Sequence, residues 1–370
     1  MTSDWGEAFH SAGLVVGVPD SLLAPLLSLI PADANHLASV NEGSAVAAAA
    51  GFALGSDSIP IVYMQNSGLG NAINPLISLA SSRVYRVPMV LVIGWRGETD
   101  ESGFSTQDEP QHNSMGEISL KLLDLLSLNT KVCDQDVPVS PQVLKEAMNL
   151  AKKEGSPVAL LVRKSGMVLA ARDASSFEPR ESEVPSRRDY LEELAGLEDT
   201  FFIATTGHIA REMYSLCTDR GSPSRLLMVT GAMGHMTSIA CGLALANPSK
   251  RFIAIDGDGS FLMHMGAITG LNRVNNLSYV GLNNDGHGSV GGQPTAVASL
   301  DMSAAIAGIT GIQVTATSTL RHFADCISKP RFFVECKTNF VTSPKLPRPT
   351  ETHFDMAQRF KEALLEQGND

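Results

Sequence analysis

Two short polar motifs stand 26 positions apart (258 to 284) in the second half of the chain, and each follows an apolar segment. Asp258 lies in a Gly-Asp-Gly turn after RFIAID (251–256), and Asn284 lies in an Asn-Asn-Asp-Gly turn after LSYVGLN (277–283). If both segments are strands of one parallel sheet, their carboxyl ends bring the two side chains to the same edge. A carboxylate, an amide oxygen and a backbone carbonyl make an incomplete oxygen shell, which Mg²⁺ completes with phosphate oxygens and water. We therefore expect a magnesium–diphosphate site here.

This pair of motifs resembles the signature of thiamine-diphosphate-dependent enzymes, in which a Gly-Asp-Gly turn is followed at similar spacing by Asn-Asn. The resemblance implies that Asp258, the Asn284 side chain and the Gly286 carbonyl bind Mg²⁺. It also implies that the diphosphate lies against Gly257, Gly259 and Ser260. Each motif alone is a common turn, so the prediction depends on their combination.

The resemblance requires a glutamate that faces the aminopyrimidine ring and helps to form the reactive ylid of the cofactor. Glu42 meets this requirement, because it follows HLASV (36–40) and opens an Ala-rich helix. Taken alone, Glu42 could be an ordinary first-turn glutamate favoured by the helix dipole. By resemblance, Met233 supports the bent cofactor and the backbone of Gly231 and Gly234 contacts it, although a plain core role is the alternative for Met233.

The resemblance assigns further residues to the two ends of the cofactor. The diphosphate side includes Thr206, Gly207, His208, His235 and His287, and the aminopyrimidine side includes Gln65, Asn66, Ser67 and Gly68. We also expect Gln65 and Asn66 to reach the substrate, because they end an apolar segment and open a helix.

Apolar segments alternate with helical patterns, which predicts an α/β fold with parallel sheets covered on both faces. Strands are expected at 14–19, 36–40, 60–65, 88–95 and 157–164, then at 201–206, 225–231, 251–256, 277–283, 312–317 and 331–337, with helices at 42–55, 68–80, 142–154 and 354–366. Residues 166–186 lose the pattern and predict a linker. We therefore predict two thiamine-diphosphate-binding-fold domains without a middle domain: a pyrimidine-binding domain (1–165) and a diphosphate-binding domain (187–370).

Composition limits the function classes. A net charge of −11 argues against nucleic-acid binding, and an anionic substrate would need a local cationic pocket. The chain has five cysteines, an odd number, and no two of them form a CxxC pair. The first residues, MTSDWGEAFH, lack a signal-peptide pattern. These features favour a reducing cytoplasm and neither a disulfide framework nor a membrane association.

Several stretches are similar to the phosphonopyruvate decarboxylases within this family, notably GVPDSLL (17–23), GWRGE (94–98) and DEPQH (108–112). The implied reaction is non-oxidative decarboxylation of 3-phosphonopyruvate to phosphonoacetaldehyde and CO₂, a step of phosphonate biosynthesis. The chain departs from these enzymes at His-Gly-Ser (287–289), where they often have His-Asp-Ser, and glycine also suits sulfopyruvate decarboxylases. Sulfopyruvate, converted to sulfoacetaldehyde, is therefore the alternative substrate. A silent nucleotide-binding α/β protein is the alternative from another class, although no GxGxxG follows the first predicted strand.

Three residues are candidate cationic contacts for the phosphonate: Arg96, Arg348 and His112. Arginine suits this task because its planar fork donates two parallel hydrogen bonds, and a solvated surface charge is the alternative for each arginine. His112 and His287 are candidate donors of the proton that replaces the lost carboxylate, although any one histidine could be structural.

Two further residues of the matching stretches are candidate substrate contacts: Asp20 and Gln111. A helix N-cap is the alternative role for Asp20. Because this family builds its site between subunits, we expect at least a homodimer, in which Glu42 of one chain serves the cofactor held by the other.

Overall fold

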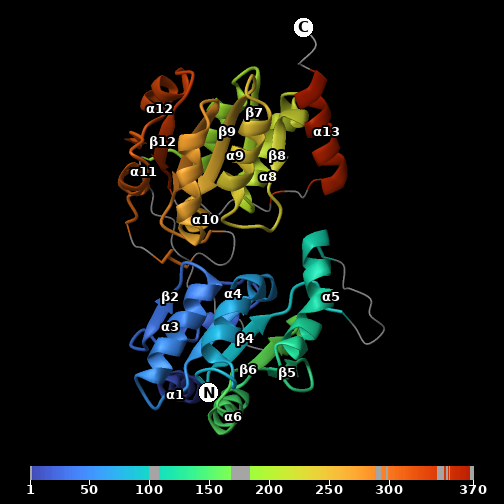
Figure 1. Ribbon diagram of the computed structural model, residues 1–370, viewed down its shortest axis with the longest axis vertical. Helices are drawn as coiled ribbons and strands as arrows, with labels where there is room; N and C mark the ends of the chain where they lie inside the picture. Colours follow the sequence, from blue (N-terminus) through green and yellow to red (C-terminus); the bar gives the residue numbers. More distant parts are fainter. Residues whose placement is uncertain are drawn as a thin grey trace. The chain divides into compact units, whose positions relative to one another are not determined.

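The computed structural model describes residues 2–99, 108–167, 184–288, 293–296, 299–339, 346, 349 and 351–366. The chain divides into two compact units, Met1–Phe177 and Glu178–Asp370, and each unit contains one six-stranded sheet (Figure 1). Most of the linker predicted at 166–186 lies outside the described residues. None of the helices among the described residues is both long and apolar enough to cross a membrane.

The first unit contains a parallel sheet with the strand order β2-β1-β3-β4-β6-β5. Its strands are β1 (Val15–Gly17), β2 (His36–Ala38), β3 (Ile61–Gln65), β4 (Val90–Gly94), β5 (Asn129–Cys133) and β6 (Val158–Val162). Its helices are α1 (Thr2–Ala12), α2 (Ala24–Leu27), α3 (Glu42–Leu54), α4 (Leu69–Pro75), α5 (Pro110–Leu125) and α6 (Pro141–Glu154). Each strand predicted in this half is present, but β5 was not predicted. This edge strand, with the sequence NTKVC, does not form an apolar run, because only its Cys133 is fully buried.

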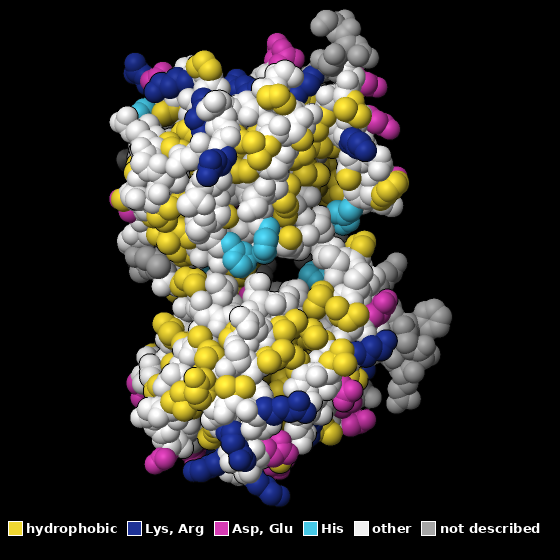
Figure 2. Space-filling model, in the orientation of Figure 1, with side chains coloured by type: hydrophobic (Ala, Val, Ile, Leu, Met, Phe, Trp, Pro, Cys, Tyr) yellow, Lys and Arg dark blue, Asp and Glu magenta, His cyan; other side chains and the backbone are white. Residues whose placement is uncertain are grey.

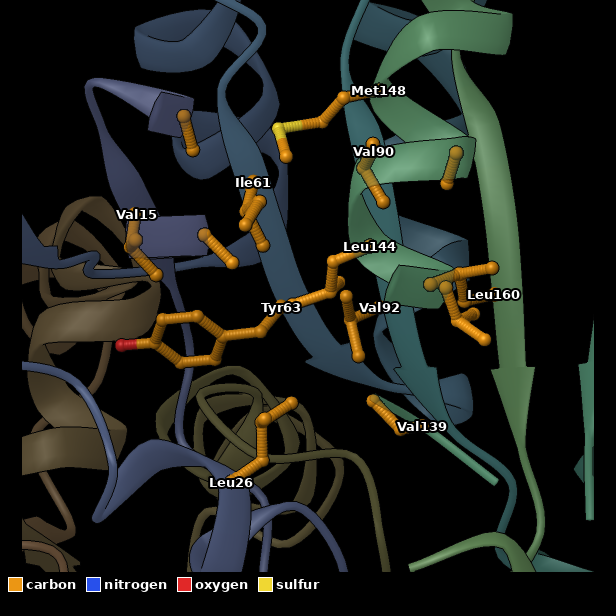
Figure 3. Packing of buried hydrophobic residues seen from close by; sticks show 14 of the residues in the cluster. Val15, Leu26, Ile61, Tyr63, Val90, Val92, Val139, Leu144, Met148 and Leu160 are labelled. Carbon is orange, nitrogen blue, oxygen red and sulfur yellow. The ribbon is translucent and has the colours of Figure 1, made fainter. Parts of the chain in front are cut away.

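Helices cover both faces of this first sheet, which explains why its central strands are almost entirely apolar. Figure 3 shows Tyr63, Val92 and Leu160 of three strands facing Leu144 and Met148 of α6, and α1 contributes to the same core. Helices α3, α4 and α5 supply the core on the opposite face.

The helix predicted at 68–80 is not one regular helix. A 3₁₀ turn (Asn66–Gly68), α4 and a π-helical turn (Leu76–Ala80) follow one another. Pro75 accounts for the change in geometry, because proline has no N–H to continue the α-helical hydrogen bonds.

The second unit also contains a parallel sheet, with the order β11-β12-β10-β9-β7-β8. Its strands are β7 (Thr200–Ala204), β8 (Leu226–Met228), β9 (Arg251–Gly257), β10 (Leu277–Asn283), β11 (Thr315–Thr317) and β12 (Phe333–Lys337). Its helices are α7 (Arg187–Ala195), α8 (His208–Asp219), α9 (Met236–Ala246), α10 (Asp258–Met263), α11 (Met302–Thr310), α12 (Leu320–Ile327) and α13 (His353–Glu366). All six strands predicted in this half are present, so the predicted fold class is confirmed.

Two apolar cores fill the faces of the second sheet, one under α7, α8 and α12 and the other under α9, α10, α11 and α13. Strands β9 and β10 pair in register along most of their length, with Leu282 opposite Gly257. The turns after these two strands therefore begin side by side at the carboxyl edge of the sheet.

Candidate active site

The predicted diphosphate residues of the second unit gather at the carboxyl edge of its sheet, after β7, β8, β9 and β10. The chain reverses its direction of strand addition between β7 and β9, because β8 lies on one side of β7 and β9 on the other. Ligands of open α/β sheets bind at such a switch point, outside the carboxyl ends of the strands.

The predicted magnesium ligands lie close together. The Gly286 N–H donates to Asp258 Oδ2 at 3.1 Å and to Asn284 Oδ1 at 3.2 Å, so both side-chain oxygens surround one nitrogen. Asp285 between them adopts a left-handed conformation with φ 58, which aspartate tolerates, and this turns the chain back toward Asp258. The donor set fits a hard cation that takes few protein ligands.

Asp258 is buried, and burial together with the nearby Asp285 carboxylate raises its pKa to about 7, while backbone N–H groups of Gly259 and Gly286 lower it. A divalent cation would stabilise the charged form of such a carboxylate. A transition metal would be better served by a group of three or more His, Cys, Asp or Glu side chains. The described residues include no such group that could hold a metal ion.

The two neighbouring asparagines have different environments. Asn283 is buried, and its Nδ2 donates to Glu335 Oε1 and to the Leu300 carbonyl, both at 2.7 Å. Glu335 in turn accepts from Lys337 Nζ at 3.0 Å. Asn283 therefore anchors the loop, whereas Asn284 is half-buried, as a side chain that reaches a ligand would be.

The Gly-Asp-Gly turn packs tightly against two side chains. A Cβ atom on Gly259 would lie 2.8 Å from the His287 ring and 3.6 Å from Met233 Cε. Met233 is half-buried above this turn and is not a plain core residue. Burial lowers the pKa of His287 to about 4, so the ring is neutral near pH 7.

A pair of histidines lies beside the turn after β8. Gly234 has φ 84, and a Cβ atom there would lie 2.6 Å from His264, whose ring centroid is 4.4 Å from that of His235. Histidine side chains are visible on this face of the second unit, near α10 (Figure 2). His264, which follows α10, was not predicted from the sequence, and its contacts with Gly234 and His235 are what bring it to this turn.

Thr206, Gly207 and His208 connect β7 to α8, and Gly207 has φ 101, which favours glycine. His208 is half-buried. Burial lowers its pKa, with smaller contributions from Arg187 and Arg211. Gly231, with φ 73, begins the turn that reaches Gly234.

In the first unit, Glu42 opens α3, whose N-terminus is capped by the Asn41 side chain. Glu42 is buried, and its Oε2 accepts from Asn71 Nδ2 at 2.7 Å. A Cβ atom on Gly68 would lie 2.5 Å from Glu42 Oε1 and 2.6 Å from its Cδ. The position of the carboxylate therefore requires glycine at 68.

The structure gives Asn66 a role in holding Arg96. The Asn66 side chain is fully buried, its Nδ2 donates to the Arg96 carbonyl and to Ser119 Oγ, both at 2.9 Å, and its Oδ1 accepts from the Arg96 N–H at 3.2 Å. Its neighbour Gln65 donates to Ser67 Oγ at 2.7 Å, and Ser67 is exposed.

Arg96 forms a bidentate ion pair with Asp108, in which Nε and Nη2 each donate at 2.9 Å. Its Nη1 reaches Ser21 Oγ at a longer 3.4 Å. Because Asp108 occupies the Nε–Nη2 edge of the guanidinium, Arg96 could meet a phosphonate only through its Nη1 side while the pair persists. Arg348 lies outside the described residues.

Asp20 lies near this ion pair and is buried. Its Oδ2 accepts from the Leu23 N–H at 3.3 Å, so it does stabilise the turn before α2, but Oδ1 has no hydrogen-bond partner within the described part of the chain. Burial raises the pKa of Asp20 to about 6, and backbone hydrogen bonds and Arg96 oppose this.

The start of α5 carries the other two candidates from the DEPQH stretch. Gln111 Nε2 donates to Glu109 Oε2 at 2.6 Å, and His112 Nε2 lies 3.8 Å from the same oxygen. Both side chains are partly buried.

Comparison with known proteins gives two family matches. Residues 10–119 match the family described as thiamine pyrophosphate enzyme, N-terminal TPP binding domain, and residues 206–324 match its C-terminal TPP binding domain. Phosphonopyruvate decarboxylase of Streptomyces viridochromogenes is 32% identical over 94% of this chain and 90% of that protein. The enzyme of the same name from Streptomyces hygroscopicus is 33% identical over 79% and 74%, respectively. Sulfopyruvate decarboxylase of Methanosarcina acetivorans is 26% identical over 95% and 94%.

Proposed function

The chain belongs to the thiamine-diphosphate-dependent decarboxylases, and we propose that it converts 3-phosphonopyruvate to phosphonoacetaldehyde and CO₂. The observation that carries the substrate assignment is the 32% identity to a phosphonopyruvate decarboxylase along nearly the whole of both chains. A sulfopyruvate decarboxylase aligns over a similar length at only 26% identity. Gly288 is the feature that favours sulfopyruvate as the alternative.

When bound, thiamine diphosphate supplies the carbon nucleophile and the electron sink for the loss of CO₂. We assign its Mg²⁺ to Asp258, Asn284 and the Gly286 carbonyl, supported by the two oxygens that converge on the Gly286 N–H. We assign the diphosphate to the Gly257–Ser260 turn at the start of α10. Because the N–H groups of Gly257 and Gly259 donate to the Asp256 and Asp258 carboxylates, the backbone N–H of Ser260 is the group that we assign to it.

Glu42 is the residue that we assign to proton exchange with the aminopyrimidine ring. The Asn71 amide binds Oε2, which leaves Oε1 to share a proton with a ring nitrogen. Gly68 lies against Oε1 and limits where the Glu42 side chain can move. Orientation of this kind is the main contribution that a protein makes to a cofactor's chemistry.

Asp20, Gln111 and His112 are the residues that we assign to the substrate in the first unit. With a pKa of about 6, Asp20 exists partly as the neutral acid near neutral pH, so it tolerates a nearby carboxylate and can donate a proton. Arg96 adds positive charge close to Asp20, although Asp108 neutralises much of it. The phosphonate therefore needs a further cation, for which Arg348 is our candidate.

The first test is CO₂ release from phosphonopyruvate and from sulfopyruvate, each with and without thiamine diphosphate and Mg²⁺. Preference for phosphonopyruvate that depends on both additions supports the proposal. Preference for sulfopyruvate would retain the cofactor chemistry but overturn the substrate assignment. Absence of release from both acids would refute both assignments.

We further propose that Glu42 of one chain serves the cofactor held by Asp258 of a second chain. Glu42→Ala and Asp258→Ala homo-oligomers should each be inactive. Co-expression should then produce mixed dimers with one intact site, and a statistical mixture should recover about a quarter of wild-type activity. If both residues act within one chain, no mixed dimer contains an intact site and activity stays absent.

A further inference from the structure

A buried polar network lies beneath the Gly-Asp-Gly turn and is not explained by the metal or the diphosphate. Asp256, near the end of β9, is fully buried, and its Oδ2 accepts from the Tyr279 hydroxyl of β10 at 3.0 Å. Its Oδ1 accepts from the Gly257 N–H at 3.0 Å. Tyr279 has no exposed surface, so neither side chain can contact a ligand directly.

Ser260 connects this pair to two other segments. Its hydroxyl hydrogen-bonds to the Asp256 carboxylate and accepts from Thr205 Oγ1 at 2.8 Å and from the Gly234 N–H at 3.2 Å. Thr205 and Ser260 are both buried. The network therefore joins the ends of β7 and β9, the middle of β10 and the turn after β8.

These contacts determine what Ser260 can do. Its hydroxyl oxygen accepts from Thr205 and Gly234, and the Ser260 and Thr205 hydroxyls both lower the pKa of the adjacent Asp256 carboxylate, so groups of the protein meet its hydrogen-bonding capacity. Ser260 can therefore meet a diphosphate only through its backbone N–H. Buried networks with every group satisfied rigidify the segments that they join, because breaking one bond leaves a polar group without a partner.

We propose that Asp256 is a positioning residue for the cofactor, which acts through Ser260 to fix the Gly231–Gly234 turn against the Gly257–Ser260 turn. Asp256 orients the Ser260 hydroxyl so that its lone pairs face Thr205 and Gly234. Tyr279 orients the carboxylate in turn. This inference rests on the proposed placement of the diphosphate at the Gly257–Ser260 turn.

The experiment measures the Kd of thiamine diphosphate by fluorescence titration at saturating Mg²⁺, together with the Tm of the enzyme without cofactor. The variants are Ser260→Ala and Tyr279→Phe. We expect Ser260→Ala to raise Kd about five- to tenfold, which corresponds to the loss of a typical hydrogen bond. Tyr279→Phe should raise Kd by a smaller factor in the same direction, because the Tyr279 hydroxyl acts on the turn through Asp256.

Ser278→Ala is a matched control. Ser278 is buried on the same strand as Tyr279, and its Oγ accepts from the Phe332 N–H at 3.1 Å, so the variant also leaves one buried N–H without its partner. Its Tm should fall as in Ser260→Ala while its Kd stays at the wild-type value. Equal Kd changes in the control and in the two variants would refute positioning, because they would reflect general destabilisation.

An Asp258→Ala variant in the same titration separates this inference from the proposed function. Wild-type affinity in Asp258→Ala would refute the placement of the diphosphate and the network's role together. Lost affinity in Asp258→Ala combined with wild-type affinity in Ser260→Ala and Tyr279→Phe would refute the positioning role alone.

Discussion

Replacing Gly68 by alanine should slow the enzyme about a hundredfold without unfolding it. Gly68 has φ −71, which any residue adopts, so alanine brings no backbone strain. The added Cβ would lie 2.5 Å from Glu42 Oε1 and 2.6 Å from Cδ. Carbon atoms pack at about 3.5–4.0 Å, so the Glu42 side chain must withdraw by about 1 Å.

The size of the effect can be worked out from this displacement. A misplacement of about 1 Å can cost about a hundredfold in rate, which corresponds to about 2.7 kcal/mol of activation free energy. Stability should change by less than about 1 kcal/mol, because a flexible side chain moves and alanine favours a helix more than glycine does.

The assay is kcat for CO₂ release at saturating cofactor, with urea denaturation of the same preparations. Exchange of the cofactor's C2 proton with deuterated water, followed by NMR, reports directly on the step that Glu42 serves. Gly70→Ala is the control, since Gly70 lies two residues further on, in the first turn of α4, and a Cβ there meets nothing within 4 Å. Wild-type kcat and exchange in Gly68→Ala would show that turnover does not depend on Glu42 in this position.

Three further outcomes are expected. Asp20→Asn should unfold with a higher free energy than the wild type at pH 8, by up to about 3 kcal/mol. Because burial raises the Asp20 pKa to about 6, its contribution to the free energy of unfolding is fully present below pH 3.8 and is lost as pH rises through 6. Urea denaturation should therefore show the free energies of unfolding of the two proteins converging in acid. Glu212→Gln should cost about 3 kcal/mol in the same measurement, because it breaks the buried bidentate pair with Arg187, whose two contacts are both 2.7 Å, whereas Arg187→Met/Glu212→Leu should cost less. Asn284→Ala should raise the Mg²⁺ concentration for half-maximal activity at least about tenfold, EDTA should abolish activity, and an unchanged Mg²⁺ requirement would contradict the ligand assignment.

Much of the site is readable from the sequence because the carboxyl ends of parallel strands, and the turns attached to them, lie at one edge of the sheet. The turn after β9 and the turn after β10 each begin at a strand end, and adjacent parallel pairing brings Asp258 and Asn284 together. The same rule placed Glu42 at the edge of the first sheet. These predictions need only strand identity and order, which apolar runs reveal.

Side-chain direction at those edges depended on tertiary contacts. The motif alone does not separate Asn283 from Asn284, but Glu335, 52 residues away, accepts from the Asn283 side chain and holds it inside the protein, whereas Asn284 is only half-buried. The sequence also could not show that Arg96 forms a bidentate ion pair with Asp108, and its role as a phosphonate contact stays a prediction.

The sequence by itself therefore determined the fold and the strand ends that carry the chemistry, since these depend on local periodicity. Its motifs indicated the cofactor through their resemblance to a known family. Only the tertiary structure decided which polar atoms face a ligand and which are used internally. Asn66 and Ser260 both belong to matching motifs, yet their side chains bind Arg96 and Asp256 inside the protein. The physical reason is that a buried polar atom must find a partner, and distant segments of the chain supply that partner.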